Sequence, residues 1–115
     1  MFRGKVISGL GVGRTLGYPT ANLDTPQNEI PLGSGVYAVR AELVGKTYAA
    51  ALVLSHEPWK VEVHLLEYDG TSCYGRVMDV FPVQKVSELE RIESEEELKK
   101  KIMDDIELVK RVLSR

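Results

Sequence analysis

The sequence predicts a mainly all-β domain of 115 residues that ends in one α-helix. Three observations support this fold class. Short apolar segments rich in strand-forming residues alternate with turn residues over the first three quarters of the chain. The spacing of apolar residues then changes from two to three or four residues in the last quarter. No repeat or linker divides the chain, and its length suits a single domain spanning residues 1–115.

Five segments share a high content of strand formers, and we expect strands at 2–8, 35–43, 46–54, 61–68 and 73–81. Val44-Gly45 indicates a tight hairpin, and Asp69-Gly70 indicates a second turn. With the extended segment around residue 20, this makes five or six strands. Short connections between them favour an antiparallel barrel or sandwich.

The segment 61–68 alternates with period two, which predicts one buried face and one more polar face. The first face carries Val61, Val63 and Leu65, and the second carries Glu62, His64 and Leu66.

The last quarter predicts one amphipathic helix. Its apolar residues recur every three or four positions and form one stripe: Leu98, Ile102, Ile106, Val109 and Leu113. Ser94 followed by Glu97 is a capping box at the start. Acidic residues in the first turn and basic residues in the last turn match the helix dipole. We expect this helix to pack against the β-structure and to contribute no chemistry.

The composition argues against a nucleic-acid-binding, a disulfide-linked or a membrane-spanning protein. The formal net charge is −2 with scattered basic residues, so we expect no nucleic-acid partner. A single cysteine, Cys73, cannot form an internal disulfide, which fits a reducing compartment. The longest apolar run, at 48–54, is far shorter than the ~20 residues of a membrane span. We therefore expect a cytoplasmic monomer without a membrane partner.

A glycine-rich segment is the strongest indication of a ligand site. Gly9, Gly11, Gly13 and Gly17 remove side chains from a short stretch that also contains Arg14. Bare backbone N–H groups and a guanidinium suit phosphate, so we predict that Gly9, Gly11, Gly13 and Arg14 bind a polyphosphate. The spacing is neither that of a P-loop nor that of the dinucleotide fingerprint. A plain turn between two strands is the alternative, with Arg14 as a solvated surface residue.

Thr20 and Asn22 follow this segment and offer neutral oxygen atoms. Their two-residue spacing puts both side chains on one face of an extended strand. Mg²⁺ prefers hard oxygen ligands and few protein groups, so we predict that both residues bind Mg²⁺ and that Thr20 also contacts phosphate. A turn stabilised by local side-chain hydrogen bonds is the alternative.

The glycine segment with Arg14, followed by Pro19-Thr20-Ala21-Asn22, resembles the riboflavin kinases (flavokinases). The resemblance covers nearly the whole chain and continues through Pro31, Gly35-Val36-Tyr37, residues 61–66, Tyr74-Gly75, residues 96–98 and Asp105. It implies a six-stranded antiparallel Greek-key barrel with a C-terminal helix packed on it. It also implies an enzyme that transfers the γ-phosphate of ATP to the 5′-hydroxyl of riboflavin to give FMN, with Mg²⁺. We expect a stand-alone riboflavin-kinase-like domain without the FAD synthetase part that bacterial relatives often carry.

The resemblance also implies roles for three further side chains. Glu62 becomes the candidate general base, because a fixed carboxylate can take the proton of an attacking alcohol. An exposed glutamate on a half-buried strand is the alternative. His64 and Tyr74 are candidates to line the nucleotide site, against structural or exposed roles for the histidine and core or rim packing for the tyrosine.

Two segments depart from the family pattern, and both belong to the riboflavin side. Residues 55–60 are shorter than the family's loop, and residues 87–92 carry Ser87 and Ile92 in place of an arginine and a phenylalanine. Two other hypotheses therefore stay open. One is a catalytically weakened flavin- or nucleotide-binding barrel. The other is an interaction domain whose glycine segment contacts a protein partner.

Overall fold

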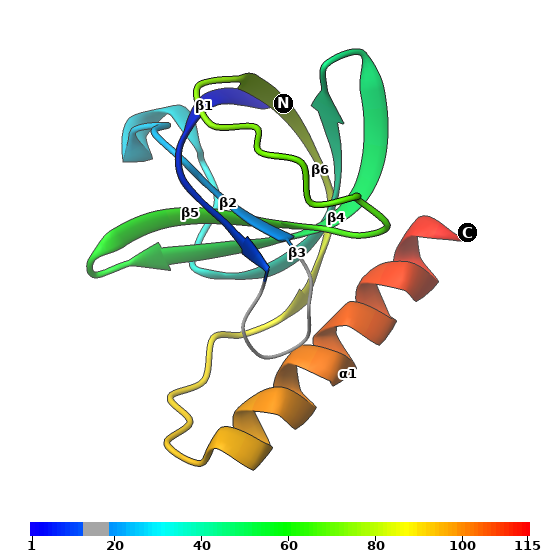
Figure 1. Cartoon of the computed structure of the whole chain (residues 1–115). Coiled ribbons are helices and arrows are strands. Elements are labelled where there is room, and N and C mark those ends of the chain that lie inside the picture. The colour runs from blue at the N-terminus through cyan, green and yellow to red at the C-terminus, as the bar shows by residue number, and fades with distance from the viewer. Residues whose placement is uncertain (13–18) are drawn as a thin grey trace.

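The computed structural model describes residues 1–12 and 19–115, and these form a closed antiparallel barrel with one long helix on its outside (Figure 1). The elements of this described part are β1 (Phe2–Val12), β2 (Pro19–Leu23), a short 3-10 helix (Gln27–Glu29), β3 (Gly35–Leu43), β4 (Lys46–His56), β5 (Trp59–Leu65), β6 (Val77–Ser87) and α1 (Glu95–Leu113). The order around the barrel is β1-β2-β5-β4-β3-β6, and β6 closes it against β1. Because β3, β4 and β5 are consecutive and β2 lies beside β5, the topology is a Greek key, as expected.

The interior of the barrel is filled by alternate residues of the strands. Its largest fully buried side chains include Leu52, Leu54, Leu65, Met78, Val39, Val63 and Val80. Alternation then turns the residues between them to the outside. The β3–β4 hairpin turns at Val44 and Gly45, which have φ values of 50° and 77° and so match the predicted tight turn.

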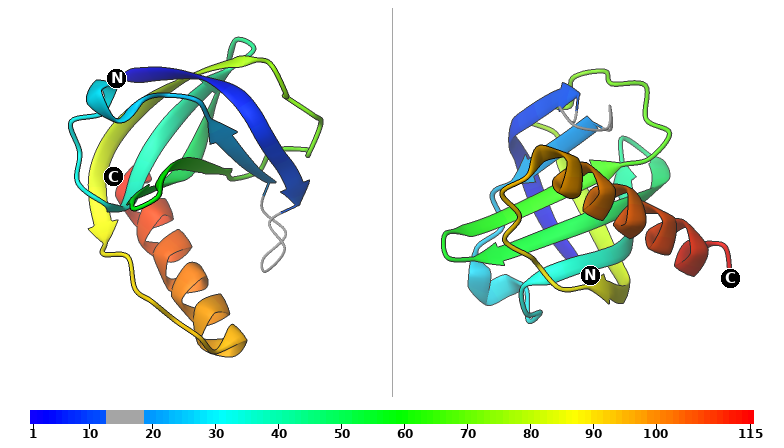
Figure 2. Two further views of the ribbon diagram at one scale, coloured as in Figure 1. Left: turned by 90° about the vertical axis from the view of Figure 1, so that its left-hand side faces the viewer. Right: turned by 90° about the horizontal axis from the view of Figure 1, so that it is seen from below.

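Helix α1 forms a second layer on the outer faces of β3, β4 and β6 (Figure 2). Ile106, Val109 and Val112 are buried there against a small apolar cluster that includes Ala38 and Ala51. The barrel therefore has an apolar interior and also one apolar patch on its outside. The helix covers that patch only in part, as the pocket described below shows.

Both ends of α1 are fixed by hydrogen bonds. The Glu97 backbone N–H donates to Ser94 Oγ at 3.4 Å, which confirms the predicted N-cap. At the other end, Arg40 Nη2 on β3 donates to the Leu113 carbonyl at 3.1 Å. This bond satisfies one of the carbonyls that a helix end leaves without a partner. The described residues contain no helix with the length and apolar character needed to cross a bilayer.

The strand predicted at 73–81 is wrong at both ends. Tyr74 and Gly75 form a turn, in which Gly75 has φ 80°, and β6 begins only at Val77. The strand then continues to Ser87 through Pro82, a residue that argues against a regular strand because it has no backbone N–H. Pro82 lies opposite Val39 next to an irregularity in the register with β3, where the missing donor is tolerated.

The predicted end of the first strand is also wrong. β1 runs to Val12, so Gly9 and Gly11 belong to a strand, and Gly9 pairs with Ala21 of β2. The register between these strands shifts between Val6 and Ser8 and again between Gly9 and Val12. Glycines within a strand commonly mark such irregularities. Gly13, Arg14 and Gly17 lie outside the described residues.

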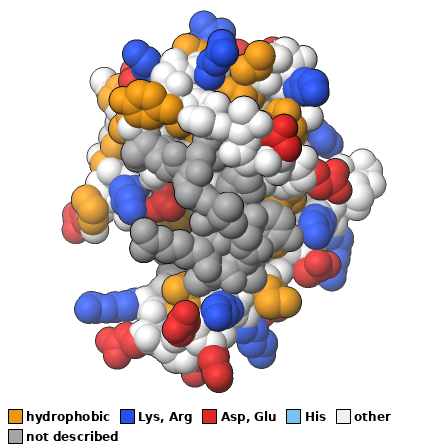
Figure 3. Space-filling model, viewed as in Figure 1, with side chains coloured by type: hydrophobic (Ala, Val, Ile, Leu, Met, Phe, Trp, Pro, Cys, Tyr) orange, Lys and Arg blue, Asp and Glu red, His pale blue; other side chains and the backbone are white. Residues whose placement is uncertain are grey.

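The face of the molecule seen in Figure 1 carries charges of both signs. On the described residues of this face, lysine and arginine side chains are interspersed with aspartate and glutamate (Figure 3).

Candidate active site

A row of directly opposed residues crosses five neighbouring strands of the barrel, and we call it the cross-strand row. Asn22 of β2 is opposite Glu62 of β5, and Glu62 is also opposite Val53 of β4. Val53 is opposite Val36 of β3, which in turn is opposite Ser87 of β6. Neighbouring strands lie about 4.8 Å apart, so the row covers roughly 19 Å along the curved wall of the barrel.

The row faces the outside of the barrel. Ala21 and Leu23 flank Asn22 and are buried in the interior, as are Val61 and Val63 on either side of Glu62. Alternation along both strands therefore turns Asn22 and Glu62 outward. The Glu62 side chain is still only 26% exposed, so it lies in a partly covered position.

Four polar side chains of β2 and β5 gather at one end of the row. Thr20 is opposite His64, and Thr20 Oγ1 lies 3.1 Å from His64 Nδ1. His64 Nε2 lies 4.0 Å from Glu62 Oε2, while Lys60 Nζ lies 3.3 Å from the other carboxylate oxygen. The structure thus brings together Thr20, Asn22, Glu62 and His64, which the sequence named separately. The predicted two-residue spacing of Thr20 and Asn22 on one face is confirmed.

The His64 side chain is largely covered, with only 21% of its surface exposed. Burial lowers the pKa of His64, because it disfavours the charged imidazolium, and the negative charge of Glu62 opposes this with a smaller effect. The ring is therefore neutral near pH 7. A neutral imidazole has one donor and one acceptor nitrogen, and the Thr20 hydroxyl can pair with Nδ1 in either tautomer.

The oxygen atoms of this group fit a magnesium ion. Thr20 offers a hydroxyl and Asn22 an amide oxygen on the same face of β2, next to the carboxylate of Glu62. Mg²⁺ commonly binds through one or two protein oxygens and takes its other ligands from phosphate and water. Thr20 and Asn22 therefore suffice as protein ligands if a polyphosphate supplies the rest.

An apolar pocket of about 390 Å³ opens beside Glu62, between the barrel and α1. Its floor is made by Val36, Ala51 and Val53 on the outer faces of β3 and β4. Its remaining described lining residues come from β5, the segment after β6 and α1: Glu62, His64, Leu89, Glu90, Leu98, Lys101, Ile102, Asp105 and Ile106. A concave, largely apolar pocket of this size with a few polar groups is typical of small-molecule sites.

Lys101 and Asp105 are polar residues that sequence reasoning assigned to no site. Lys101 Nζ lies 2.6 Å from Asp105 Oδ2 and donates to Ser87 Oγ at 2.9 Å, which joins α1 to the end of β6. The helix was expected to serve packing alone, and the structure shows that it also lines the pocket. The sequence feature that could have indicated these pocket residues is a lysine and an aspartate four residues apart, each next to a residue of the apolar stripe.

The two segments that depart from the family pattern differ in their position relative to the pocket. Residues 55–60 form the tight β4–β5 hairpin, and none of them lines the pocket. Within it, Trp59 packs against the barrel core, and its Nε1–H donates to the Thr25 carbonyl at 2.8 Å. The segment 87–92 does border the pocket, through Leu89 and Glu90.

The other predicted site residues either lie away from the pocket beside Glu62 or fall outside the described residues. Tyr74 lies on a turn with 71% of its surface exposed and does not line the pocket beside Glu62. Gly9 and Gly11 lie on β1, next to the strand that carries Thr20 and Asn22. Gly13 and Arg14 fall outside the described residues, so their phosphate role stays a prediction.

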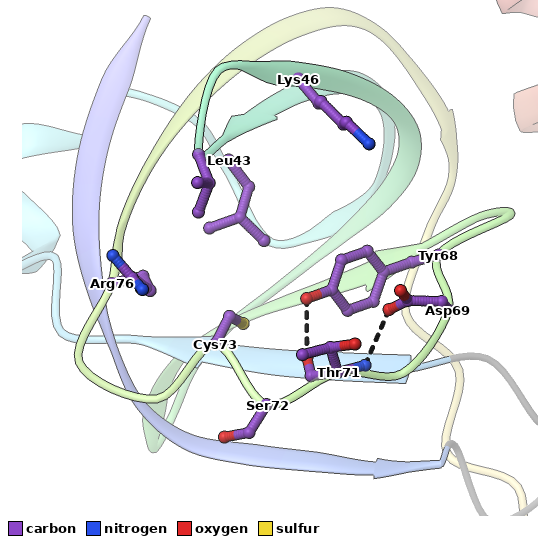
Figure 4. A pocket seen from close by; sticks show the side chains of 9 residues that line it. Leu43, Lys46, Tyr68, Asp69, Thr71, Ser72, Cys73 and Arg76 are labelled. Carbon is purple, nitrogen blue, oxygen red and sulfur yellow. Dashed lines mark hydrogen bonds between the residues drawn. The ribbon is translucent and has the colours of Figure 1, made fainter.

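A second cavity of about 280 Å³ lies between the β3–β4 hairpin and the segment 66–76 (Figure 4). Here the Tyr68 hydroxyl donates to the Thr71 carbonyl at 2.6 Å, and the Thr71 N–H donates to Asp69 Oδ1 at 2.8 Å. Burial raises the pKa of the Cys73 thiol, which keeps it protonated and a poor nucleophile. These polar groups shape their own loop, and we assign no reaction to this cavity.

Solved structures share this barrel and its outer helix. A crystal structure described as a macrolide-efflux protein from Streptococcus pneumoniae matches with a TM-score of 0.78 and 24% identity over 94% of this chain and 35% of its own. The crystal structure of riboflavin kinase from Trypanosoma brucei matches with a TM-score of 0.71 and 21% identity over 98% of this chain and 76% of its own. At these identities the likeness shows the fold.

The sequence comparisons define the family. Residues 1–113 match the family model described as Flavokinase, riboflavin kinase, and the chain belongs to this family. The bifunctional riboflavin kinase/FMN adenylyltransferase of Buchnera aphidicola subsp. Schizaphis graminum is 35% identical over 94% of this chain. The match covers 37% of that relative, so the chain spans little more than a third of its length.

Proposed function

We propose that this protein is a riboflavin kinase, which transfers the γ-phosphate of ATP to the 5′-hydroxyl of riboflavin and releases FMN and ADP. Family membership and the names of the relatives support this activity. The observation that carries it is the position of Glu62 on the cross-strand row. Its carboxylate lies between Asn22 on one side and the apolar pocket over Val53 on the other.

The acceptor binds in the pocket. The flat isoalloxazine ring rests on Val53 and Val36 beneath α1, where its apolar surface leaves water. The ribityl chain extends toward β5, so that its 5′-hydroxyl reaches Glu62. Glu62 then takes the hydroxyl proton as the oxygen attacks the γ-phosphorus and ADP leaves.

The nucleotide binds on the side of β2. Thr20 and Asn22 would hold Mg²⁺, which neutralises charge on the phosphates when it is bound. The backbone of Gly9, Gly11 and Gly13, together with Arg14, binds the polyphosphate. His64 keeps the Thr20 side chain in place through the 3.1 Å contact, and it lies close enough to Glu62 to face the reacting groups.

Residues 1–115 form one domain in this proposal, and a cytoplasmic monomer stays our expectation. The departures at 55–60 and 87–92 favour one second candidate, a barrel that binds flavin or nucleotide with weakened turnover. Of these two segments, only 87–92 borders the pocket. Of the two replaced residues in it, Ser87 contacts Lys101, which lines the pocket.

The decisive experiment mixes purified protein with riboflavin, ATP and Mg²⁺ and separates the flavins by chromatography. Formation of FMN that depends on ATP and metal supports the kinase. Bound flavin without FMN, under every donor and metal tried, favours the weakened binding module. If neither flavin nor nucleotide binds, the interaction domain becomes the better explanation.

A further inference from the structure

A lysine lies beside the proposed base on β5. Lys60 precedes Glu62 by two residues, and Val61 between them is buried, so alternation turns Lys60 and Glu62 to the same outer face. Lys60 Nζ lies 3.3 Å from Glu62 Oε1. Among the described lysine, arginine and histidine side chains, the only other one within 4.0 Å of this carboxylate is His64, on the opposite oxygen. Lys60 is therefore the one described ammonium or guanidinium beside the carboxylate.

The pair with Glu62 leaves the Lys60 ammonium available to another anion. The Lys60 side chain is 55% exposed and carries its ammonium on a flexible four-carbon stem. Exposed ion pairs contribute little to stability, because water screens them and fixing a long side chain costs entropy. A lysine ammonium also has three N–H groups, and Glu62 uses one of them. Lys60 can therefore turn to a second anion at little cost.

The proposed reaction places such an anion next to Lys60. Transfer joins the γ-phosphorus to the 5′-oxygen of riboflavin, breaks the bond from phosphorus to the oxygen that leaves with ADP, and gives the hydroxyl proton to Glu62. A neutral alcohol has then become a phosphate monoester, which carries a charge of about −1.5 to −2 near pH 7. Once ADP and its metal have left, this charge needs a partner from the protein.

We propose that Lys60 binds the 5′-phosphate of FMN and makes the protein hold this product more tightly than riboflavin. This inference rests on the proposed function, since it concerns the product of the same site. The lysine that lines the acceptor pocket, Lys101, is held by Ser87 and Asp105 at the opposite end of the cross-strand row. Lys60 belongs to residues 55–60, where this chain departs from the family pattern, so the contact is a feature of this chain in particular.

The contact distinguishes product from substrate by charge. Riboflavin presents a neutral hydroxyl to Lys60, whereas FMN presents phosphate oxygens, and hydrogen bonds between two charged groups are the stronger ones. The exposure of Lys60 limits the size of the effect, because water and salt screen the attraction. Lys60 is thus a binding residue for the product and takes no part in the proton transfer to Glu62.

The test compares the dissociation constants of riboflavin and FMN, measured by quenching of flavin fluorescence on the intact protein. Nucleotide is omitted and EDTA removes divalent metal, so that no other ion bridges the phosphate. We expect FMN to bind at least about fivefold more tightly than riboflavin, or ~1 kcal/mol. In Lys60→Met the two flavins should bind within about twofold of each other, and Lys60→Arg, which keeps the charge, should retain the preference.

The matched control is Lys99→Met on α1. Lys99 is 47% exposed and also pairs with a glutamate, Glu95, but it does not line the pocket. The substitution changes the net charge by the same amount as Lys60→Met, so the preference for FMN should persist if the contact is local. Added salt should reduce the preference in the unmodified protein, because it screens an exposed charge pair.

Equal binding of riboflavin and FMN by the unmodified protein overturns the proposal before any variant is made. A preference that survives in Lys60→Met overturns it as well, and so does a preference that Lys99→Met abolishes. If the unmodified protein makes FMN but shows no preference, the phosphate contact is wrong and the kinase stands. If it binds neither flavin and makes no FMN, both fail.

Discussion

Asn22 and Glu62 are directly opposed cross-strand partners on β2 and β5, with both side chains on the outer face of the barrel. Directly opposed residues have Cβ atoms about 4.5–5.5 Å apart, so the amide and the carboxylate are neighbours without any intervening loop. Groups placed by strands are held more firmly than groups on loops. The proposed base and one proposed metal ligand are thus positioned by the hydrogen-bond ladder itself.

Replacing Glu62 by glutamine should remove the general base while keeping the shape of the side chain. We expect kcat for FMN formation to fall by about 10²–10⁴-fold, with riboflavin affinity largely retained because the pocket stays intact. Steady-state kinetics and fluorescence titration measure the two effects separately. Glu57→Gln, at an exposed site on the adjoining hairpin, is the matched control. Full activity in Glu62→Gln would contradict the assignment.

Removing the Thr20 hydroxyl with Thr20→Val, or the Asn22 amide with Asn22→Ala, should weaken metal binding. We expect the Mg²⁺ concentration for half-maximal activity to rise by about tenfold, the scale seen when groups around a metal site are altered. Thr47→Val changes an exposed threonine of β4 and should leave the Mg²⁺ titration unchanged. An unaltered Mg²⁺ requirement together with lost riboflavin affinity would place these residues on the flavin side instead.

His64 should make the stability of the protein depend on pH. Its pKa in the folded state lies below the reference value of 6.5, so the unfolded chain binds a proton more readily. Stability therefore falls as the pH drops below about 6.5, until the folded-state pKa is passed. In His64→Gln this contribution is absent, and the free energy of unfolding should fall less with acidification. Urea unfolding of both proteins at about pH 7.5 and at about pH 5.5 checks this. Parallel pH dependences would show that His64 does not contribute.

Gly4 on β1 has no room for a side chain. A Cβ atom there would lie 2.9 Å from Leu23 Cβ and closer still to Thr25 Oγ1, which donates to the Arg3 carbonyl. We expect Gly4→Ala to destabilise the protein by about 1–3 kcal/mol, as other overpacked cores do. Gly33→Ala is the matched control, because a Cβ at Gly33 meets nothing within 4 Å. Denaturant unfolding compares the two, and equal stabilities would show that β1 and β2 can move apart at little cost.

Much of the fold could be predicted because local patterns agreed with the tertiary structure. The alternation around Glu62 correctly assigned its face, and Ser94 correctly marked the start of α1. The strand predicted at 73–81 starts too early, because Tyr74 and Gly75 form a turn, and ends too early, because β6 continues through Pro82. The strand around Pro82 is paired with β3, which lies far away in the sequence and outside any local window.

The candidate site was predictable in part for the same reason. Thr20, Asn22, Glu62 and His64 stand on two strands whose periodicity shows their faces, but only the β2–β5 pairing reveals that they meet. The pocket was missed because it forms where α1 meets the barrel, as the contact of Lys101 with Ser87, 14 residues earlier and on another element, illustrates. The local spacing of residues in the sequence does not reveal such long-range contacts.

The antiparallel ladder between β2, β5 and β4 has a consequence for how this chain can change in length. Side chains alternate along a strand, so losing one residue between Trp59 and Glu62 would move the carboxylate to the interior, among Val61, Val63 and their neighbours. A buried, unpaired carboxylate is far too costly for a small barrel. Connections between the strands do not carry this constraint, because they have no fixed inward and outward faces. Within β5, the parity of the residue count is therefore a requirement of the proposed activity.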